Sequence, residues 1–322
     1  MTLVQAVRSA LEHELARDER VLVLGEDVGR NGGVFRATDG LLDRFGPDRV
    51  IDTPLAELGI IGTSVGLAAS GLVPVAEIQF LGFAYQAFAE IAGQAARFRY
   101  RSQGRFACPL TIRAPYGGGV RTPELHSDAL ETLFLHSQGL KVVAPGTAAD
   151  ARGLLISAIR DPDPVVFLEP LRGYRAIRGE VPDDDSAVPI GPARLAREGG
   201  DVTLIAWSAM VPVAMAAAER AAVDGIDTEV IDLRTIAPFD ADALAASVEK
   251  TGRAVVLHEA PQTGGVGAEI VATMMERAFL SLEAPIERVT GYDTLYPLGM
   301  FEDDWVPDAD RTLAALRRVM AY

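Results

Sequence analysis

Glu57 is the first candidate for acid–base chemistry in this sequence. It ends the segment Asp52–Glu57, in which Thr53 would cap a helix and Pro54 would be its first residue. The acidic position of a capping box would fall on Ala56, so the carboxyl of Glu57 is free for other chemistry, and its neighbours predict an apolar setting. Position alone also allows a simpler role, in which the carboxylate interacts favourably with the helix dipole.

His126 is the second candidate and lies near the end of a glycine-rich segment that spans residues 116–128. Ser127 or Asp128 could cap the helix that follows it. A histidine on such a loop can transfer protons near neutral pH and can move with the loop. A surface histidine beside a helix cap has the same pattern, so this pattern leaves both roles open.

Two signals near the C-terminus are weaker. The Gly264–Gly267 run lies between a predicted strand and a predicted helix, where a helix N-terminus could hold a phosphate. The run is neither GxGxxG nor a P-loop, so a tight turn that needs glycine dihedral angles is favoured. His258, at the end of an apolar run, is expected to face an interface rather than a site.

Composition narrows the possible functions. The 322 residues include 45 acidic and 30 basic side chains, a formal net charge of −15. Such a field repels phosphate backbones, so we expect no nucleic-acid partner. Cys108 is the only cysteine, which excludes an intramolecular disulfide and a paired-cysteine zinc site, and the four histidines show no metal-binding spacing.

No segment is typical of a secretory leader or a membrane span. The first 20 residues place their apolar side chains on one helical face rather than in a continuous run. Val202–Ala218 is uncharged, but Ser208 and Pro212 interrupt it, so a buried strand followed by a helix explains it better. We therefore expect a cytoplasmic protein without membrane contact.

Short apolar runs alternate with helical patterns, which predicts an α/β fold with parallel sheets covered by helices. Strands are predicted at 21–25, 73–80, 110–113, 141–144 and 165–168, and later at 202–207, 229–233, 254–258 and 286–289. Helices are predicted at 3–16, 57–70, 83–101, 128–137 and 147–160, and later near 212–223, 240–250, 267–280 and 309–320. Prolines, glycines and acidic residues interrupt the pattern between them. The predicted organisation is a first domain over 1–170, a linker over 171–200 and a smaller second domain over 201–322.

The helix predicted at 57–70 carries three glycines, Gly59, Gly62 and Gly66. Glycine lowers helix propensity but allows a neighbouring backbone to come close. We therefore expect this helix to be central and tightly packed.

Eight segments, in order, resemble one family over nearly the whole chain: the β subunit of the thiamine-diphosphate-dependent, decarboxylating component of 2-oxo acid dehydrogenase complexes. They are GEDVGRNGGVFRATDGL (25–41), DTPLAELGIIG (52–62), PVAEIQFLGF (74–83), HSDALE (126–131), GLKVVAP (139–145), AIRDPDPVVFLEP (158–170), EVIDLRTIAP (229–238) and KTGRAVVLHEA (250–260). The resemblance implies a pyrimidine-binding thiamine-diphosphate domain followed by a transketolase-like C-terminal domain.

The resemblance also implies roles for six residues around the cofactor. Glu57 would hydrogen-bond the aminopyrimidine ring nitrogen, and Phe83 would stack on that ring. His126 would lie near the thiazolium and the incoming lipoyl arm, where it can exchange protons during acyl transfer. The remaining pocket residues implied are Glu26, Leu55 and Gln79.

Metal ions and partners follow from the same resemblance. A structural potassium ion is expected at Leu110, Ala158, Asp161 and Asp163, although relatives often have Asn at the last of these positions. The cofactor's diphosphate and Mg²⁺ would be held by an α subunit, because this chain has no GDG motif. The expected assembly is an α₂β₂ heterotetramer, with the second domain joining β to β and docking a lipoyl acyltransferase core.

The implied activity is the oxidative decarboxylation of pyruvate or a branched-chain 2-oxo acid, with transfer of the acyl group to a lipoyl group. AEIQFLGF (76–83) and RFRYRSQG (97–104) resemble the branched-chain enzymes. An acetoin dehydrogenase β subunit and a non-catalytic scaffold are the alternatives. The presence of Glu57, Phe83 and His126 together disfavours the scaffold.

Overall fold

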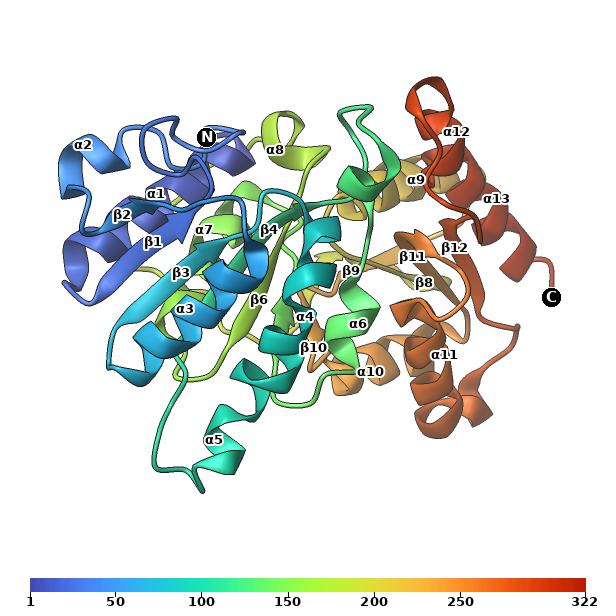
Figure 1. Cartoon of the computed structure of the whole chain (residues 1–322). Helices are drawn as coiled ribbons and strands as arrows, with labels where there is room; N and C mark the ends of the chain where they lie inside the picture. Colours follow the sequence, from blue (N-terminus) through green and yellow to red (C-terminus); the bar gives the residue numbers. More distant parts are fainter.

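Two mainly parallel sheets organise the protein, and the computed structural model describes all 322 residues (Figure 1). The first sheet has the strand order β10-β5-β6-β4-β3-β1-β2. Its strands are β1 (Val21–Gly25), β2 (Val50–Asp52), β3 (Val73–Glu77), β4 (Thr111–Tyr116), β5 (Lys141–Val143), β6 (Val165–Pro170) and β10 (Thr235–Ala237). All pairs except β10–β5 are parallel, as the strand–helix alternation predicts.

Helices cover this sheet on both faces. They are α1 (Leu3–Arg17), α2 (Leu41–Phe45), α3 (Glu57–Ala69), α4 (Ala84–Gly93), α5 (Phe98–Arg101), α6 (Glu131–Leu135), α7 (Ala148–Arg160) and α8 (Gly173–Ala176). A capping box between Thr2 and Gln5 begins α1, and the Thr147 side chain caps α7. The two helices pack against each other through their apolar faces, as the period of their apolar residues predicts.

The second sheet has the order β12-β11-β8-β9-β7, in which only β7 is antiparallel to its neighbour. Its strands are β7 (Arg194–Arg197), β8 (Val202–Ala206), β9 (Thr228–Asp232), β11 (Ala254–Pro261) and β12 (Glu287–Gly291). The helices of this domain are α9 (Met210–Val223), α10 (Ala241–Thr251), α11 (Val266–Arg277), α12 (Glu302–Trp305) and α13 (Ala309–Val319). The predicted α/β fold with two domains is confirmed.

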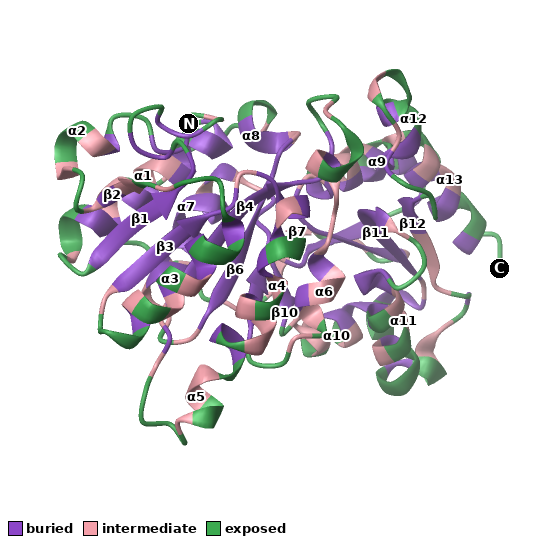
Figure 2. Ribbon diagram, in the orientation of Figure 1, coloured by how far each residue is buried: buried purple, intermediate pink, exposed green.

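The two domains share structure. Strand β10 follows β9 in sequence, yet it pairs with β5 at the edge of the first sheet. One apolar cluster also runs from Leu24 and Ile112 in the first sheet to Ile205 and Val256 in the second. In Figure 2 the buried strands of both sheets form a continuous band. The second domain therefore completes the core of the first.

Three local expectations need correction. Residues 171–200, predicted as a linker, include α8 and the edge strand β7, whose half-exposed residues gave little apolar signal. Helix α3 begins at Glu57, so Pro54 is not its first residue and Thr53 does not cap it. The Thr53 hydroxyl instead donates to the Pro54 carbonyl oxygen. The helix predicted over 83–101 is broken after Gly93 into α4, a 3₁₀ turn (Ala95–Arg97) and α5.

No helix in the structure combines the length and apolar character needed to cross a membrane.

Candidate active site

Four strand ends bring the predicted pocket residues together. Strands β4, β3, β1 and β2 are adjacent and parallel. The segments after them therefore all leave the sheet at the carboxyl ends of its strands, which form one edge of the sheet. Glu26 follows β1, Glu57 comes soon after β2, and Gln79 follows β3. His126 lies on the segment after β4, in the short 3₁₀ helix η3 (Glu124–Ser127). The sheet topology thus brings residues that are far apart in the sequence to the same edge of the sheet.

Glu57 and Glu26 form a buried acidic pair at the centre of this edge. Their exposed fractions are 3% and 7%, and Glu57 Oε2 and Glu26 Oε1 have no hydrogen-bond partner within the chain. Burial, followed by the nearby negative charge of Glu57, raises the pKa of Glu26. Buried oxygens without partners are costly unless a ligand supplies donors, so this pair is suited to accept hydrogen bonds from a bound group.

Two phenylalanine rings pack on His126. Phe83 lies in the 3₁₀ helix η1 (Leu81–Phe83), and its ring centroid is 5.0 Å from that of His126. Both rings contact Phe80 edge to face, at 5.7 Å and 4.6 Å. The structure therefore brings Phe83 and His126 into contact, with Phe80 packed against both rings.

Gly82 makes this juxtaposition possible. A Cβ there would lie 1.8 Å from the carbonyl oxygen of Leu125, so no other residue fits without moving η3. His126 Nδ1 is buried and has no partner in the chain. One ring nitrogen is thus available for a bound group, and histidine can exchange a proton there.

The two remaining pocket residues differ in exposure. Gln79 is half-buried, and its Nε2 donates to Asp27 Oδ2 at 3.4 Å. Leu55 is 78% exposed, so it cannot support a ligand from the interior of this chain. It lies on the turn before α3 beside exposed Leu58. Two apolar side chains at the start of α3 are therefore exposed to solvent.

Helix α3 also departs from the expectation of tight packing. Leu58 is exposed, and a Cβ at Gly66 would meet nothing within 4 Å. At Gly59 and Gly62 a Cβ would make only ordinary contacts, at 3.6 and 3.9 Å. Packing within this chain therefore does not explain the three glycines.

The four residues expected to hold potassium lie at the opposite edge of the sheet, where the amino ends of the strands are. Leu110 precedes β4, while Ala158 and Asp161 end α7. Lys141 Nζ bonds both carboxylate oxygens of Asp161, at 2.7 and 2.6 Å, and Arg99 Nε bonds Asp163 at 2.5 Å. Both acids are thus already neutralised by cations. The side chains do not supply an anionic ligand set, and only backbone carbonyls would be left for an ion.

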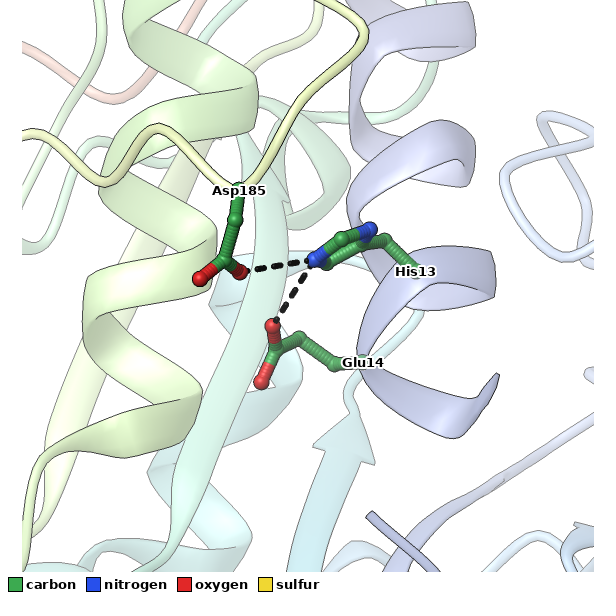
Figure 3. A group of neighbouring side chains, drawn as sticks. All are labelled: His13, Glu14 and Asp185. Atoms are coloured by element: carbon green, nitrogen blue, oxygen red, sulfur yellow. Dashed lines mark hydrogen bonds and ion pairs between the residues drawn. The ribbon is translucent and has the colours of Figure 1, made fainter. Parts of the chain in front are cut away.

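A second cluster has the composition of a metal site but is an ion-pair cluster. Figure 3 shows His13 pointing toward Glu14 and Asp185, with its Nε2 3.8 Å and 2.9 Å from their carboxylates. The charge of Glu14 is neutralised by Arg17 at 2.9 Å and Arg160 at 2.6 Å. Guanidinium groups at these distances compete with a metal for the same oxygens. The cluster instead attaches the segment around Asp185 to α1.

Sequence reasoning missed the buried support beneath the pocket. The guanidinium of Arg113 on β4 is fully buried, with a bidentate bond to Glu169 on β6 at 2.6 and 2.9 Å and a bond to Glu77 on β3 at 2.7 Å. Tyr174 also bonds Glu169. This network joins three strands whose ends lead to the pocket. The signal in the sequence that could have predicted this network is the presence of Glu77, Arg113 and Glu169 within otherwise apolar strand segments.

Comparisons with known proteins show the family of the chain. Residues 1–176 match the transketolase pyrimidine-binding domain family, and residues 191–312 match the transketolase C-terminal domain family. The chain is 58% identical over 308 residues to the pyruvate dehydrogenase E1 component subunit beta of Staphylococcus epidermidis, covering 96% of this chain and 95% of that protein. It is 53% identical over 322 residues to the protein of the same name from Bacillus subtilis, covering 100% and 99%.

Solved structures share the fold. A split-gene transketolase, described as an inactive beta4 tetramer, superposes with a TM-score of 0.82 at 23% identity and covers 100% of this chain and 98% of its own. A transketolase mutant from Pichia stipitis gives a TM-score of 0.73 at 14% identity, covering 100% of this chain and 46% of its own. At these identities the likeness supports the two-domain architecture alone.

Proposed function

The chain belongs to the family of pyruvate dehydrogenase E1 component β subunits, a thiamine-diphosphate-dependent enzyme family, and on this basis we propose that it acts with an α subunit in the oxidative decarboxylation of pyruvate. The acyl group would pass to a lipoyl group of an acyltransferase partner. The single observation that carries the proposal is the buried Glu57–Glu26 pair with its unpartnered oxygens, which lies after neighbouring strands of the sheet that also leads to the Phe83 and His126 rings.

These residues suit the pyrimidine half of thiamine diphosphate. Glu57 Oε2 is a buried acceptor without a donor, and an aminopyrimidine can supply one. Phe83 offers an aromatic surface, and Gln79 a polar edge, for the same ring. When bound, the cofactor supplies an electron sink for cleavage of the bond to the carboxylate.

The chain's own residues would do the remaining work. Glu57 holds a proton on the pyrimidine ring nitrogen and so sets the tautomer of the amino group. Burial keeps water from competing for that hydrogen bond. His126, whose Nδ1 has no partner within the chain, would give or take a proton when the acyl group leaves.

The need for an α subunit is supported by what this chain lacks and exposes. No GDG motif is present to hold a diphosphate with Mg²⁺. Leu55 and Leu58 are 78% and 53% exposed beside Glu57, and the glycines of α3 make no close contact within the chain. An apolar, glycine-bearing face beside an open pocket is suited to a partner that closes it. We propose that the α subunit packs there, in an α₂β₂ heterotetramer.

Pyruvate is the preferred substrate in this proposal because the relatives at 53–58% identity are named pyruvate dehydrogenase. The resemblance of residues 76–83 and 97–104 to branched-chain enzymes favoured the other substrate class, so a broader acyl range is the competing prediction. The substrate test below separates the two.

The experiment measures thiamine diphosphate binding, with Mg²⁺, by this chain alone and after co-expression with its α subunit. Turnover of pyruvate, 3-methyl-2-oxobutanoate and acetoin is then followed with an artificial electron acceptor. Tight binding and pyruvate turnover in the mixture alone are expected. Tight binding by the β chain alone would contradict a cofactor site shared with the α subunit. Faster turnover of 3-methyl-2-oxobutanoate or acetoin would make that compound, rather than pyruvate, the preferred substrate.

Two further expectations belong to this proposal. A potassium ion at Leu110, Ala158, Asp161 and Asp163 would have to rely on carbonyl oxygens, and replacing K⁺ by Na⁺ would then lower the Tm. We expect the complex to act in the cytoplasm, without a membrane or nucleic-acid partner.

A further inference from the structure

The segment between β4 and His126 is pressed against the second domain. A Cβ at Gly117, where φ is +76°, would lie 2.6 Å from Glu259 Oε2. A Cβ at Gly118 would lie 1.6 Å from the hydroxyl of Tyr296. Only glycines allow the backbone to come this close to two side chains of the second domain.

Two buried carboxylates of the second domain hold this backbone by hydrogen bonds. Gly118 N donates to Glu259 Oε1 at 2.6 Å, and Arg121 N donates to Glu302 Oε2 at 3.1 Å. Glu259 and Glu302 are only 5% and 2% exposed. Leaving a buried polar group without its hydrogen-bond partner costs free energy, so these bonds favour one position of the segment.

The acids are themselves held in place. Arg172, which precedes α8, donates to Glu302 at 3.3 Å and to Asp303 at 3.2 Å, and Arg121 pairs with Asp303 at 3.0 Å. Tyr296 packs on Trp305 of α12, with ring centroids 4.6 Å apart. The segment therefore lies between α8 and α12 (Figure 1).

The other end of the segment reaches the pocket. Leu125 packs on Gly82 of η1, and His126 contacts the rings of Phe80 and Phe83. The segment is thus fixed at its root by the second domain and at its tip by the pocket wall. A shift at the root would be carried over a few residues to His126.

We propose that Glu259, Tyr296 and Glu302 form a dock for residues 117–121 that positions His126 for acyl transfer. The second domain then takes part in catalysis in addition to assembly. This inference rests on the proposed function, because the dock acts through His126. Glu259 and Glu302 are positioning residues in this scheme.

The test compares Glu259→Ala, which removes the acceptor of Gly118 N, with Glu259→Gln, which keeps an acceptor oxygen in place. Glu229→Ala is the matched control, since Glu229 is 2% exposed in the same domain and bonds Ser247 rather than the segment. Each variant is assembled with the α subunit, thiamine diphosphate and Mg²⁺. The readouts are hydrogen exchange of residues 117–127, the kcat and KM for acylation of a lipoyl domain, and the Kd of the cofactor.

For Glu259→Ala we expect about tenfold faster exchange of the segment and about tenfold lower kcat for lipoyl acylation, with little change in the cofactor Kd or the pyruvate KM. Glu259→Gln should restore both. Glu229→Ala should leave the exchange of the segment unchanged. His126→Gln should lower acylation without changing that exchange.

The dock is wrong if Glu259→Ala leaves the exchange of residues 117–127 at the wild-type rate, or if Glu229→Ala accelerates it equally. Faster exchange with unchanged acylation would overturn the positioning role. A wild-type assembly without turnover would instead refute the proposed function, while the exchange data would still decide whether the segment is docked.

Discussion

Glu57 is the residue whose chemistry the sequence and the structure together define most sharply. It is the first residue of α3, so a role in stabilising the helix dipole competes with a role toward the cofactor. Its burial and the unpartnered Oε2 favour the cofactor role.

We expect Glu57→Gln to lower decarboxylation by about 100-fold or more, because the amide cannot hold the ring proton as a carboxyl does. The assembly size should not change. Glu269→Gln is the matched control, since Glu269 is an exposed glutamate in the first turn of α11. Equal, small effects of the two substitutions on turnover would assign Glu57 to the helix dipole alone.

Glu131, five residues after His126, is a buried acid that the proposed reaction does not use. It is fully buried, and neither of its carboxylate oxygens has a partner. Burial raises the pKa of Glu131 from 4.5 to about 7. Between these values the unfolded chain loses the proton and the folded chain keeps it, so folding stability falls as pH rises.

Glu131→Gln removes this titration with little change of shape. Raising the pH from 5 to 8 should therefore destabilise the wild type more than the variant, by on the order of 1–3 kcal/mol. Urea unfolding of both proteins at the two pH values measures the difference. Parallel pH profiles would mean that the carboxyl ionises normally in the folded protein.

Among the secondary-structure elements, Arg160 of α7 pairs with both Glu14 of α1 and Asp185, the two acids that Figure 3 shows beside His13. Its members differ in exposure: the side chain of Glu14 is fully buried, whereas that of Asp185 is 67% exposed. Breaking a buried pair leaves charges without partners, while an exposed pair is screened by water.

Glu14→Gln should therefore lower the free energy of unfolding by about 1–2 kcal/mol, because Arg17 and Arg160 lose the buried carboxylate that they share but remain partly hydrated. Asp185→Asn should have a much smaller effect. Denaturant unfolding of the two variants side by side gives the comparison. A larger effect of Asp185→Asn would show that attachment of the segment, rather than the contact between α1 and α7, dominates.

At the scale of the whole molecule, the two domains are coupled by a shared core. Strand β10 completes the first sheet, and apolar residues of both domains form one cluster. An interface built as a continuous core does not open at low cost, so the domains are expected to unfold together.

The tryptophans allow a direct test, because Trp207 and Trp305 both lie in the second domain. Fluorescence therefore reports that domain, whereas far-UV circular dichroism reports the whole chain. We expect the two signals to follow one coincident urea transition for the isolated chain. Separate transitions would show that the domains unfold independently despite β10.

Local patterns in the sequence predict most of the long elements. The apolar periods of α1, α7, α9 and α13 and the runs in β1, β8 and β9 match the structure closely, because such patterns depend on local residues. The sequence also determined the family, since the segments that carry the resemblance keep their order and spacing. Short strands such as β2, β7 and β10 were missed because three or four residues carry too little periodicity.

The support of the candidate site depends on contacts between residues that lie far apart in the sequence. His258, expected at an interface, is instead fully buried and stacked on Trp207, with Gly265 packed closely against its ring. The contact of Gly118 with Glu259 spans 141 positions, and that of Arg121 with Glu302 spans 181. No local pattern encodes which acid meets which amide at such separations. Those pairs are fixed by the packing of one domain on the other, which is why the dock for the His126 segment could not be seen in the sequence.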